Sequence, residues 1–307
     1  MDYLPEVLAG EEPYCEITKA FSFSRDAVFL LIEARSDEGE QAASALLKVT
    51  LSADPTYEVL HEFDSGALDY HAASPDLHYV LASGGYLHEL RGGTLTVHPF
   101  AAEAFLDNLA PLGDGTIAVF GEGGLMFRFS GGTYTRIPVD TEEDLHALHA
   151  PTAGTGYVGG DYGTLLRFDG ASLSPVDLGT NVFIRALHLK ADGTLLVGGA
   201  DGEAYVLRDE ELLTVEGAEA DFYSVTVFKG VEYWGDDDYG IYTRDGLAFA
   251  PRFNTGYAFD MTATDDLLTI NAGYWVYVFD GSDWLQLQVN ADMETLIERV
   301  PLDFEPL

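Results

Sequence analysis

Glycines that recur at a constant interval constrain the fold of this chain more than any other feature. Gly121, Gly160 and Gly199 follow one another every 39 residues. Two further sets keep that interval: Gly115, Gly154 and Gly193, each followed by a threonine (Thr116, Thr155, Thr194), and Gly124, Gly163 and Gly202. Three sets of positions that share one period indicate a repeated structural unit rather than a single loop or site.

Weaker copies extend the repeat in both directions to seven units. They include LASGGYLHELRGG (81–93), YWGDDDYGIYTRDG (233–246) and INAGYWVYVFDG (270–281), and a divergent first copy covers about 16–63. Within a unit, four short apolar runs are separated by Gly and Asp turns, which is typical of short strands. Four strands in about 40 residues is the period of a propeller blade, and no unit shows the 3.6-residue periodicity of a helix.

The sequence therefore predicts an all-β protein, a seven-bladed β-propeller of four-stranded antiparallel blades in a single domain, 1–307. The expected blades are 16–64, 68–101, 105–139, 143–179, 183–217, 222–253 and 258–290, followed by a C-terminal tail, 291–307. The first and last blades each hold four strands on continuous chain. We therefore expect the ring to close by packing of sheets, helped by residues 3–8 or by the tail, as a short helix or an added strand.

Two segments carry a family resemblance. GTLLRFDG (163–170) and VFDGSDW (278–284) resemble the BNR/YVTN/kelch-type repeats of bacterial propellers. The resemblance extends over most of the chain and is weakest in the first two blades. It implies the propeller fold and says little about function, because such propellers serve as scaffolds, lyases, sialidases and assembly factors.

The charge balance restricts the choice of partner. Asp and Glu number 52 against 15 Lys and Arg, which gives a formal net charge of -37. Nucleic acids and anionic membranes are disfavoured because they require Lys and Arg at the contact. A basic protein partner is favoured, since long-range attraction speeds its capture. The alternative is that the acidity only maintains solubility or suits a salty cytoplasm, and the sequence leaves both interpretations open.

The termini and the single cysteine indicate the compartment. Cys15 is the only cysteine, so no disulfide within the chain is expected. The first residues lack both the basic region and the apolar core of a signal peptide, and no apolar run is long enough to span a bilayer. We expect a cytoplasmic protein that is a monomer outside its complex.

Motifs for catalysis and for cofactors are absent from the sequence. It has no G-x-x-x-x-G-K-[ST] phosphate loop, no Cys/His cluster at zinc spacing and no G-x-S-x-G nucleophile elbow. We therefore predict no enzyme activity, no cofactor and no metal. Calcium at Asp236–Asp238 is an alternative, because three carboxylates share that turn, but the spacing is not that of a calcium-binding loop.

Aligning the units places one position of each first strand in register at the central channel. The predicted channel-mouth ring is Lys19, Tyr70, Asp107, His146, Arg185, Ser224 and Asp260. One interpretation is a binding surface of mixed charge. The other is ordinary polar lining in which Lys19, Asp107, Arg185 and Asp260 pair with one another. His149 and His188 also align, and we interpret them as structural histidines.

The predicted function is non-catalytic binding of a basic protein. One concrete version is an inhibitor or immunity protein that neutralises a basic toxin such as a nuclease. The alternatives are a carbohydrate- or small-molecule-active propeller that uses the channel mouth, and an assembly factor for a larger complex. The predicted partner-binding residues lie on turns of one face: Asp161, Tyr162, Trp234, Asp236, Asp237, Asp238 and Tyr239. Trp234 is a candidate aromatic anchor or, like Trp284, a core residue between blades.

Overall fold

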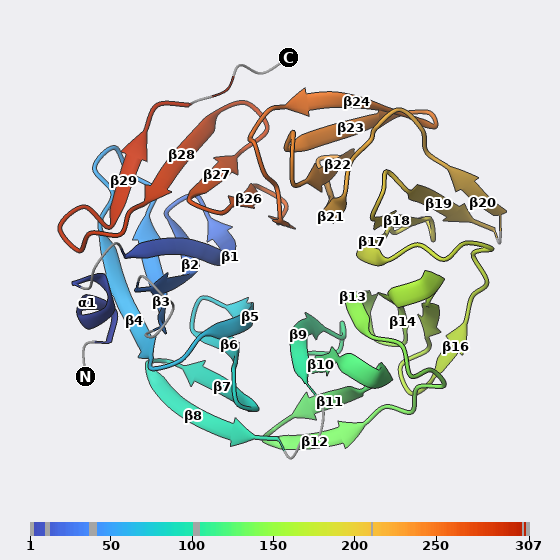
Figure 1. Ribbon diagram of the computed structural model, residues 1–307, viewed down its shortest axis with the longest axis horizontal. Helices are drawn as coiled ribbons and strands as arrows, with labels where there is room; N and C mark the ends of the chain where they lie inside the picture. Colours follow the sequence, from blue (N-terminus) through green and yellow to red (C-terminus); the bar gives the residue numbers. More distant parts are fainter. Residues whose placement is uncertain are drawn as a thin grey trace.

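Seven antiparallel sheets form a ring around a central opening (Figure 1). The computed structural model describes residues 3–9, 13–36, 42–100, 105–209, 211–302 and 304. Six sheets have four strands and one has five, and the strands of each sheet are consecutive in sequence. The predicted seven-bladed β-propeller is confirmed.

The elements have the following bounds. Helix α1 (Tyr3–Leu8) precedes blade 1, which is β1 (Tyr14–Ser24), β2 (Ala27–Arg35), β3 (Ala42–Thr50) and β4 (Tyr57–Phe63). Blade 2 is β5 (Ala67–Ser74), β6 (Leu77–Ala82), β7 (Tyr86–Arg91) and β8 (Thr94–Pro99). Blade 3 is β9 (Leu106–Pro111), β10 (Ile117–Gly121), β11 (Met126–Ser130) and β12 (Thr133–Arg136). Blade 4 is β13 (Leu145–Thr152), β14 (Thr155–Gly160), β15 (Leu165–Phe168) and β16 (Leu173–Pro175). Blade 5 is β17 (Ile184–Leu189), β18 (Leu195–Gly199), β19 (Ala204–Arg208) and β20 (Glu211–Thr214). Blade 6 is β21 (Phe222–Phe228), β22 (Val231–Asp236), β23 (Ile241–Asp245) and β24 (Ala248–Phe253). Blade 7 is β25 (Asp260–Ala263), β26 (Leu268–Ala272), β27 (Trp275–Phe279), β28 (Trp284–Val289) and β29 (Ile297–Val300). Short 3-10 turns, η2 (Glu122–Gly124) and η3 (Asp161–Gly163), follow β10 and β14.

The second strand of each blade is the most deeply buried. Every residue of β10, β18 and β26 is buried, because neighbouring blades cover both faces of these strands. The fourth strands lie at the outside of the ring, and β8 and β20 leave most of their side chains partly or fully exposed. The apolar core is therefore a series of layers between adjacent blades.

Two of the three sets of repeated glycines lie where backbone segments approach each other closely. A Cβ atom added to Gly160, at the end of β14, would collide with the backbone carbonyl of Asp144. Gly163 has a φ of +74°, and a Cβ there would collide with the carbonyl of Thr180. These two sets therefore record the close approach, whereas Gly115 and Gly193 have open space around them and a left-handed backbone that favours glycine.

The ring closes without exchange of a strand between the first and last blades. The backbone N–H of Ile17 donates to the carbonyl of Gly273 at 2.8 Å, and the side-chain amide of Asn271 donates to two carbonyls of β1. Leu4 and Leu8 of α1 belong to the apolar cluster that joins blades 1 and 7. The tail supplies β29, which pairs with β28 as a fifth strand. No helix in the described part of the chain is long and apolar enough to cross a membrane.

Candidate functional site

The two faces of the propeller are built from different connections. We call upper face the one that carries the turns between second and third strands and the segments that lead into first strands. Its described residues are 64–66, 83–85, 105, 122–125, 137–144, 161–164, 176–183, 200–203, 215–221, 237–240, 254–259 and 273–274. The lower face carries the turns between first and second strands and between third and fourth strands, for example 190–194, 229–230, 246–247, 264–267 and 280–283.

A β-bulge shapes the upper mouth of the channel. In blades 3, 4 and 5 the pairing of the first two strands skips one residue near the start of the first strand, and that residue is Asp107, His146 and Arg185 respectively. In blade 6 the skipped residue is Tyr223, one position before Ser224. A bulge turns its extra side chain away from the regular alternation of the strand, so these side chains lie at the rim of the mouth.

The predicted ring therefore combines different structural positions. Lys19, Ser224 and Asp260 are regularly paired residues rather than extra ones, and Tyr70 comes two positions after the skipped residue of its blade. Six of the seven predicted residues line the central cavity, and Asp107 does not. Its neighbour Asn108 lines the cavity instead, as does Asp69, the residue before Tyr70.

Three residues of the predicted ring pair with acids outside it. The Nη1 of Arg185 bonds to Asp221 at 2.8 Å, and its guanidinium lies 4.7 Å above the ring of Tyr223. His146 Nε2 contacts the carboxylate of Asp161 at 2.5 Å. The ammonium of Lys19 bonds to Asp69 at 2.5 Å. Within the described ranges, no ion pair joins two of the four residues Lys19, Asp107, Arg185 and Asp260.

The two aligned histidines lie against each other inside the channel wall. The rings of His149 and His188 stack with centroids 4.4 Å apart, and His149 Nδ1 accepts a hydrogen bond from the backbone N–H of Leu189 at 2.9 Å. Burial lowers the pKa of His149 to about 3 and that of His188 to about 4. Both imidazoles are therefore uncharged near neutral pH.

Two of the predicted contact residues are buried. Trp234 is 0% exposed and packs between Phe222 and Phe249 in the core between blades 5 and 6. Asp236 is 1% exposed, and its carboxylate accepts hydrogen bonds from the backbone N–H groups of Tyr239 and Gly240. In this conformation neither side chain can touch a partner, because Trp234 fills the core and Asp236 caps the turn that follows β22.

The other predicted contact residues lie on the upper face. Tyr162 is 62% exposed at a φ of +52°, Asp238 is exposed, and Asp161, Asp237 and Tyr239 are half-buried. Asp237 and Asp238 line a hollow of about 370 Å³ together with Asp201, Glu219, Ala220 and Asp221. Only Asp221 of these acids has a cationic partner among the ion pairs of the described residues. No group of three or more His, Cys, Asp or Glu side chains in the described part of the chain is arranged to hold a metal ion.

Exposed aromatic side chains gather on the upper face, a feature that the sequence analysis missed. Among the residues that the structure describes, the exposed large aromatic side chains belong to this face or to strand ends that reach it: Tyr14, Tyr86, Phe105, Tyr162, Phe183, Tyr257, Phe259 and Tyr274. The ring of Phe183 contacts that of Tyr162 at 5.5 Å, and Phe259 contacts both Tyr223 and Tyr257. On the turns of the lower face the exposed large apolar residues are aliphatic, Val231 and Leu247.

A recurring sequence position would have located part of this set. This position lies just ahead of the first strand, two residues before Asp107 in blade 3 and before the equivalent residue of blades 4 to 7. From blade 3 to blade 7 it is occupied by Phe105, Asp144, Phe183, Asp221 and Tyr257. Asp144 and Asp221 each accept a backbone N–H from the turn of the preceding blade, at Gly123 and Asp201. Where the position is aromatic it has no such carboxylate, and its ring is left exposed on the face.

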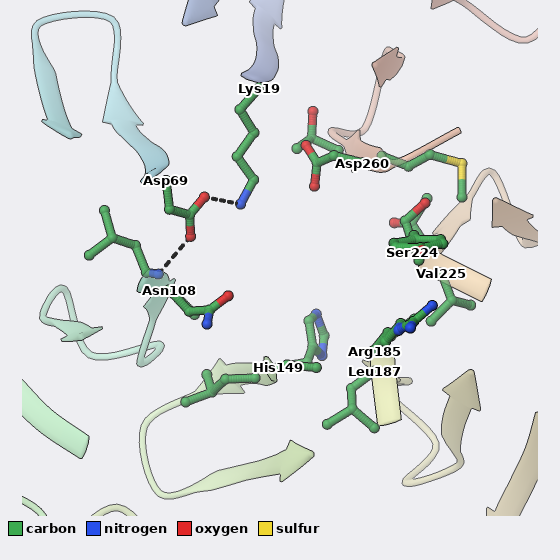
Figure 2. Close-up of a pocket in the computed structure, with 18 of the residues that line it drawn as sticks. Lys19, Asp69, Asn108, His149, Arg185, Leu187, Ser224, Val225 and Asp260 are labelled. Atoms are coloured by element: carbon green, nitrogen blue, oxygen red, sulfur yellow. Dashed lines mark hydrogen bonds and ion pairs between the residues drawn. The ribbon is translucent and has the colours of Figure 1, made fainter. Parts of the chain in front are cut away.

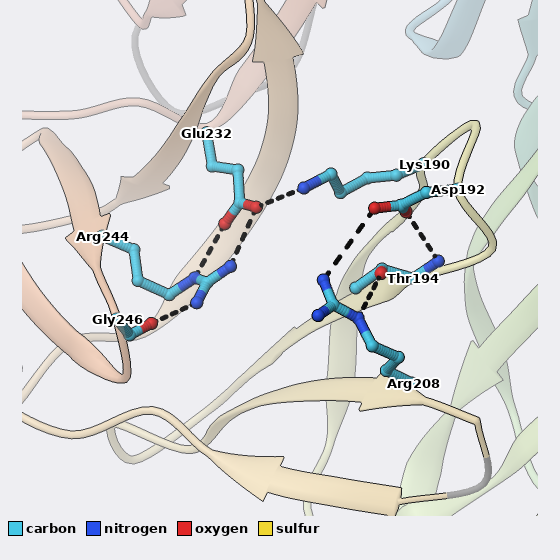
Figure 3. Close-up of polar contacts among 7 residues, drawn as sticks. All are labelled: Lys190, Asp192, Thr194, Arg208, Glu232, Arg244 and Gly246. Carbon is cyan, nitrogen blue, oxygen red and sulfur yellow. Dashed lines mark hydrogen bonds and ion pairs between the residues drawn. The ribbon is translucent and has the colours of Figure 1, made fainter.

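Several acids at the lower face pair with bases of this chain. Arg244 grips Glu232 through two nitrogens, at 2.7 Å and 2.9 Å, and Lys190 reaches the same carboxylate at 2.9 Å (Figure 3). Arg208 lies 3.9 Å from Asp192 (Figure 3), and Arg25 bonds to Asp280 at 2.8 Å. Burial acts to raise the pKa of Glu232, but the hydrogen bonds and charges of Arg244 and Lys190 outweigh it and hold that pKa below its usual range.

Solved structures share this fold at low sequence identity. The WD40 β-propeller domain of Doa1 matches with a TM-score of 0.69 at 10% identity, over 89% of this chain and 95% of that one. The computationally designed protein Ika8 matches with a TM-score of 0.66 at 12% identity, over 95% and 98% of the two chains. Ycf48 bound to a D1 peptide matches with a TM-score of 0.56 at 14% identity, over 72% and 80%.

These likenesses show that the chain shares the β-propeller fold of these structures. They do not confirm the BNR/YVTN/kelch repeat type, which stays an interpretation of the sequence. No family model matches the chain, and no curated protein matches it. At identities this low, the comparison shows the fold and leaves the function to the site.

Proposed function

We propose that this chain is a non-catalytic, protein-binding propeller that captures a basic protein on its upper face. The observation that carries the proposal is the concentration of exposed aromatic side chains on the same face as the acids that have few cationic partners. Aromatic residues dominate the energetics of protein interfaces, because they bury a large area with few rotatable bonds. Acids around them complement lysine and arginine on the partner.

The face already holds one guanidinium in the manner proposed for a partner. Arg185 lies between the carboxylate of Asp221 and the ring of Tyr223. A cation over an aromatic face and beside a carboxylate is stabilised by both contacts. The exposed ring of Tyr162 and the exposed carboxylate of Asp238 are accessible to a side chain from outside.

The finer version of the proposal is an inhibitor or immunity protein that neutralises a basic toxin such as a nuclease. The net charge of -37 supports it. An acidic inhibitor attracts a basic target over distances well beyond contact and therefore captures that target quickly. The solved structure of Ycf48 with a D1 peptide is a second support, as it shows that a propeller of similar fold holds a polypeptide. A cytoplasmic location is part of the same proposal.

The experiment compares three purified forms of the chain as bait in an extract of the source organism. The test variant carries Tyr162→Asn and Phe183→Ser, which remove aromatic area from the upper face. The matched control carries Val231→Thr and Leu247→Ser, which remove aliphatic area from the lower face. We expect a basic protein to be retained by the wild type and by the control, and to be lost from the test variant.

The binding of that protein is then measured with purified components in a salt series. Affinity that falls steeply between about 50 mM and 500 mM salt supports electrostatic capture, because screening shortens the reach of surface charges. Affinity that does not change with salt contradicts it. Replacement of His146 and Arg185 together tests the enzyme alternative, since a reaction at the channel mouth would require them.

A further inference from the structure

The central channel holds a cavity that charged and aliphatic side chains line together. Its volume is about 950 Å³, and the first strands of all seven blades line it. Lys19, Asp69 and Asp260 line one part of its wall, which we call the polar zone (Figure 2). Leu187, Val225 and Met261 add aliphatic surface to the wall. A cavity of this size with both charged and aliphatic lining suits a small amphipathic ligand.

In the polar zone, one base lies near two acids. The ammonium of Lys19 bonds to Asp69 Oδ1 at 2.5 Å. The same carboxylate also accepts the backbone N–H of Tyr70 at 2.8 Å and, through Oδ2, that of Leu109 at 2.6 Å. The charge of Asp69 is therefore compensated by an ammonium and two amides.

Asp260 is the acid that is left over. Its carboxylate projects from the start of β25 into the cavity (Figure 2). Its Oδ2 is buried and has no hydrogen-bond partner among the described residues. Burial raises the pKa of Asp260, while Lys19 opposes the shift and Asp69 adds to it. Asp260 as a whole is half-buried, but a buried carboxylate oxygen without a partner is costly for a protein to maintain.

Among the described residues, the other basic side chains around the cavity form no ion pair with Asp260. Arg185 is held by Asp221 and Tyr223, and His146 is held by Asp161. His71, His149 and His188 are uncharged near neutral pH, since burial lowers their pKa values to about 4, 3 and 4. Within the described part of this chain, Asp260 has only a share of the charge of Lys19, which is hydrogen-bonded to Asp69, so a cation from outside would add to its compensation.

We propose that the cavity binds an alkyl-guanidinium or alkyl-ammonium group, with its charge beside Asp260 and its carbon chain along the aliphatic wall. A cation there compensates a carboxylate that is shielded from bulk water, where electrostatic attraction is stronger than at the surface. The site is separate from the acidic hollow of the upper face. It does not depend on the proposed capture of a protein, because a free small molecule would supply the same group.

The test uses butylguanidinium and its uncharged isostere butylurea as probes, at about 150 mM salt. Binding is measured by calorimetry and by the NMR shifts of the ring protons of His149 and His188, which line the cavity. We expect one saturable site for butylguanidinium and binding at least tenfold weaker for butylurea. Asp260→Asn should weaken butylguanidinium binding at least tenfold. Asp265→Asn, which removes the same charge at an exposed position of the lower face outside the cavity, should leave it unchanged.

Three outcomes would overturn the proposal: no saturable binding by the wild type, equal binding by Asp260→Asn, or an equal loss in Asp265→Asn, which would indicate general attraction to an acidic surface. Thermal unfolding of each variant checks that it folds. A second probe, the peptide Gly-Gly-Arg-Gly-Gly, distinguishes two sources of the cation. Competition between peptide and butylguanidinium supports delivery by a side chain of another protein, and binding of butylguanidinium alone supports a free small molecule.

Discussion

The upper and lower faces of this propeller are made by the same repeat, yet they differ in their exposed side chains. On the lower face some acids pair with bases, as Glu232 pairs with Arg244 and Lys190, and others such as Asp265 and Asp266 are exposed without an ion pair in the described part of the chain. On the upper face, Asp201, Glu219, Asp237 and Asp238 have no cationic partner among the described ion pairs, and exposed aromatic rings lie on the same face. Acidity alone does not distinguish the two faces, so it is the exposed aromatic side chains on the face of the acidic hollow that favour a partner there.

Charge reversal at the hollow should give the largest effect on this comparison. In a variant with Asp237→Lys and Asp238→Lys, we expect the association rate with the basic partner to fall by about 100-fold, because attraction becomes repulsion. The matched control reverses Asp265 and Asp266, two exposed neighbours on the lower face. Stopped-flow or surface-based kinetics measure both. An equal fall in the control would mean that the faces do not differ in function.

Breaking the lower-face network should affect stability instead of binding. Arg244→Met leaves the nearly buried carboxylate of Glu232 with Lys190 alone, and we expect unfolding free energy to fall by about 2 kcal/mol. Arg208→Met, at an exposed pair 3.9 Å apart, should cost under about 0.5 kcal/mol. Denaturant unfolding at neutral pH gives both values, and comparable losses would contradict the special role of Glu232.

The pH dependence of the same variant follows from the lowered pKa of Glu232. A carboxyl whose pKa is lower in the folded state stabilises the fold above its unfolded-state pKa, and this contribution is lost as the pH falls through the folded-state value. The difference between wild type and Arg244→Met should therefore shrink in acid. A difference that is constant down to low pH would point to lost packing of the arginine stem.

Removing one aromatic ring from the upper face should have a moderate effect. Tyr162→Asn is expected to weaken the partner complex about tenfold with little change in thermal stability, because the ring is 62% exposed. Asparagine is chosen since residue 162 has a left-handed backbone, which asparagine tolerates. Val231→Thr on the lower face is the control. Unchanged affinity in Tyr162→Asn would remove that ring from the interface.

The smallest expected effect concerns the channel, where a residue is kept at a cost. Asp260→Asn should raise the unfolding free energy by about 1 kcal/mol near neutral pH, because it removes a buried charge without a partner of its own. Since the pKa of Asp260 is raised in the fold, protonation in acid removes the same cost, and the advantage of the variant should disappear there. A variant less stable than wild type would show that the carboxylate is structural.

The sequence predicted the ring of blades well, because each further copy of the 39-residue spacing is independent support for the same repeated unit. Gly160 meets the backbone carbonyl of Asp144, and Gly121 and Gly199 meet a carbonyl in the same way. Because these contacts leave no room for a side chain, glycine recurs there in blades whose surface residues differ. The period also predicted four strands per blade. It left open whether the tail is a helix or a strand, because β29 belongs to no repeat.

The site was less predictable, because one inserted residue changes which side chain reaches the channel. Counting in steps of 39 leads from Arg185 to Ser224, whereas the bulge of blade 6 places Tyr223 at the corresponding position. Burial was a second difficulty. Asp236 and Asp237 are neighbours of the same type, and only the hydrogen bonds to Tyr239 and Gly240 show that the first supports the turn while the second lines the hollow.

The closure of the ring has a consequence for how such a chain can evolve. Each sheet consists of consecutive strands, and blades 1 and 7 meet through hydrogen bonds and apolar packing rather than through a shared sheet. The structural unit and the duplicated stretch of gene therefore coincide. A tandem duplication that begins and ends in a segment between blades would add a complete blade, and a new start point in any such segment would yield a circular permutant with every sheet intact.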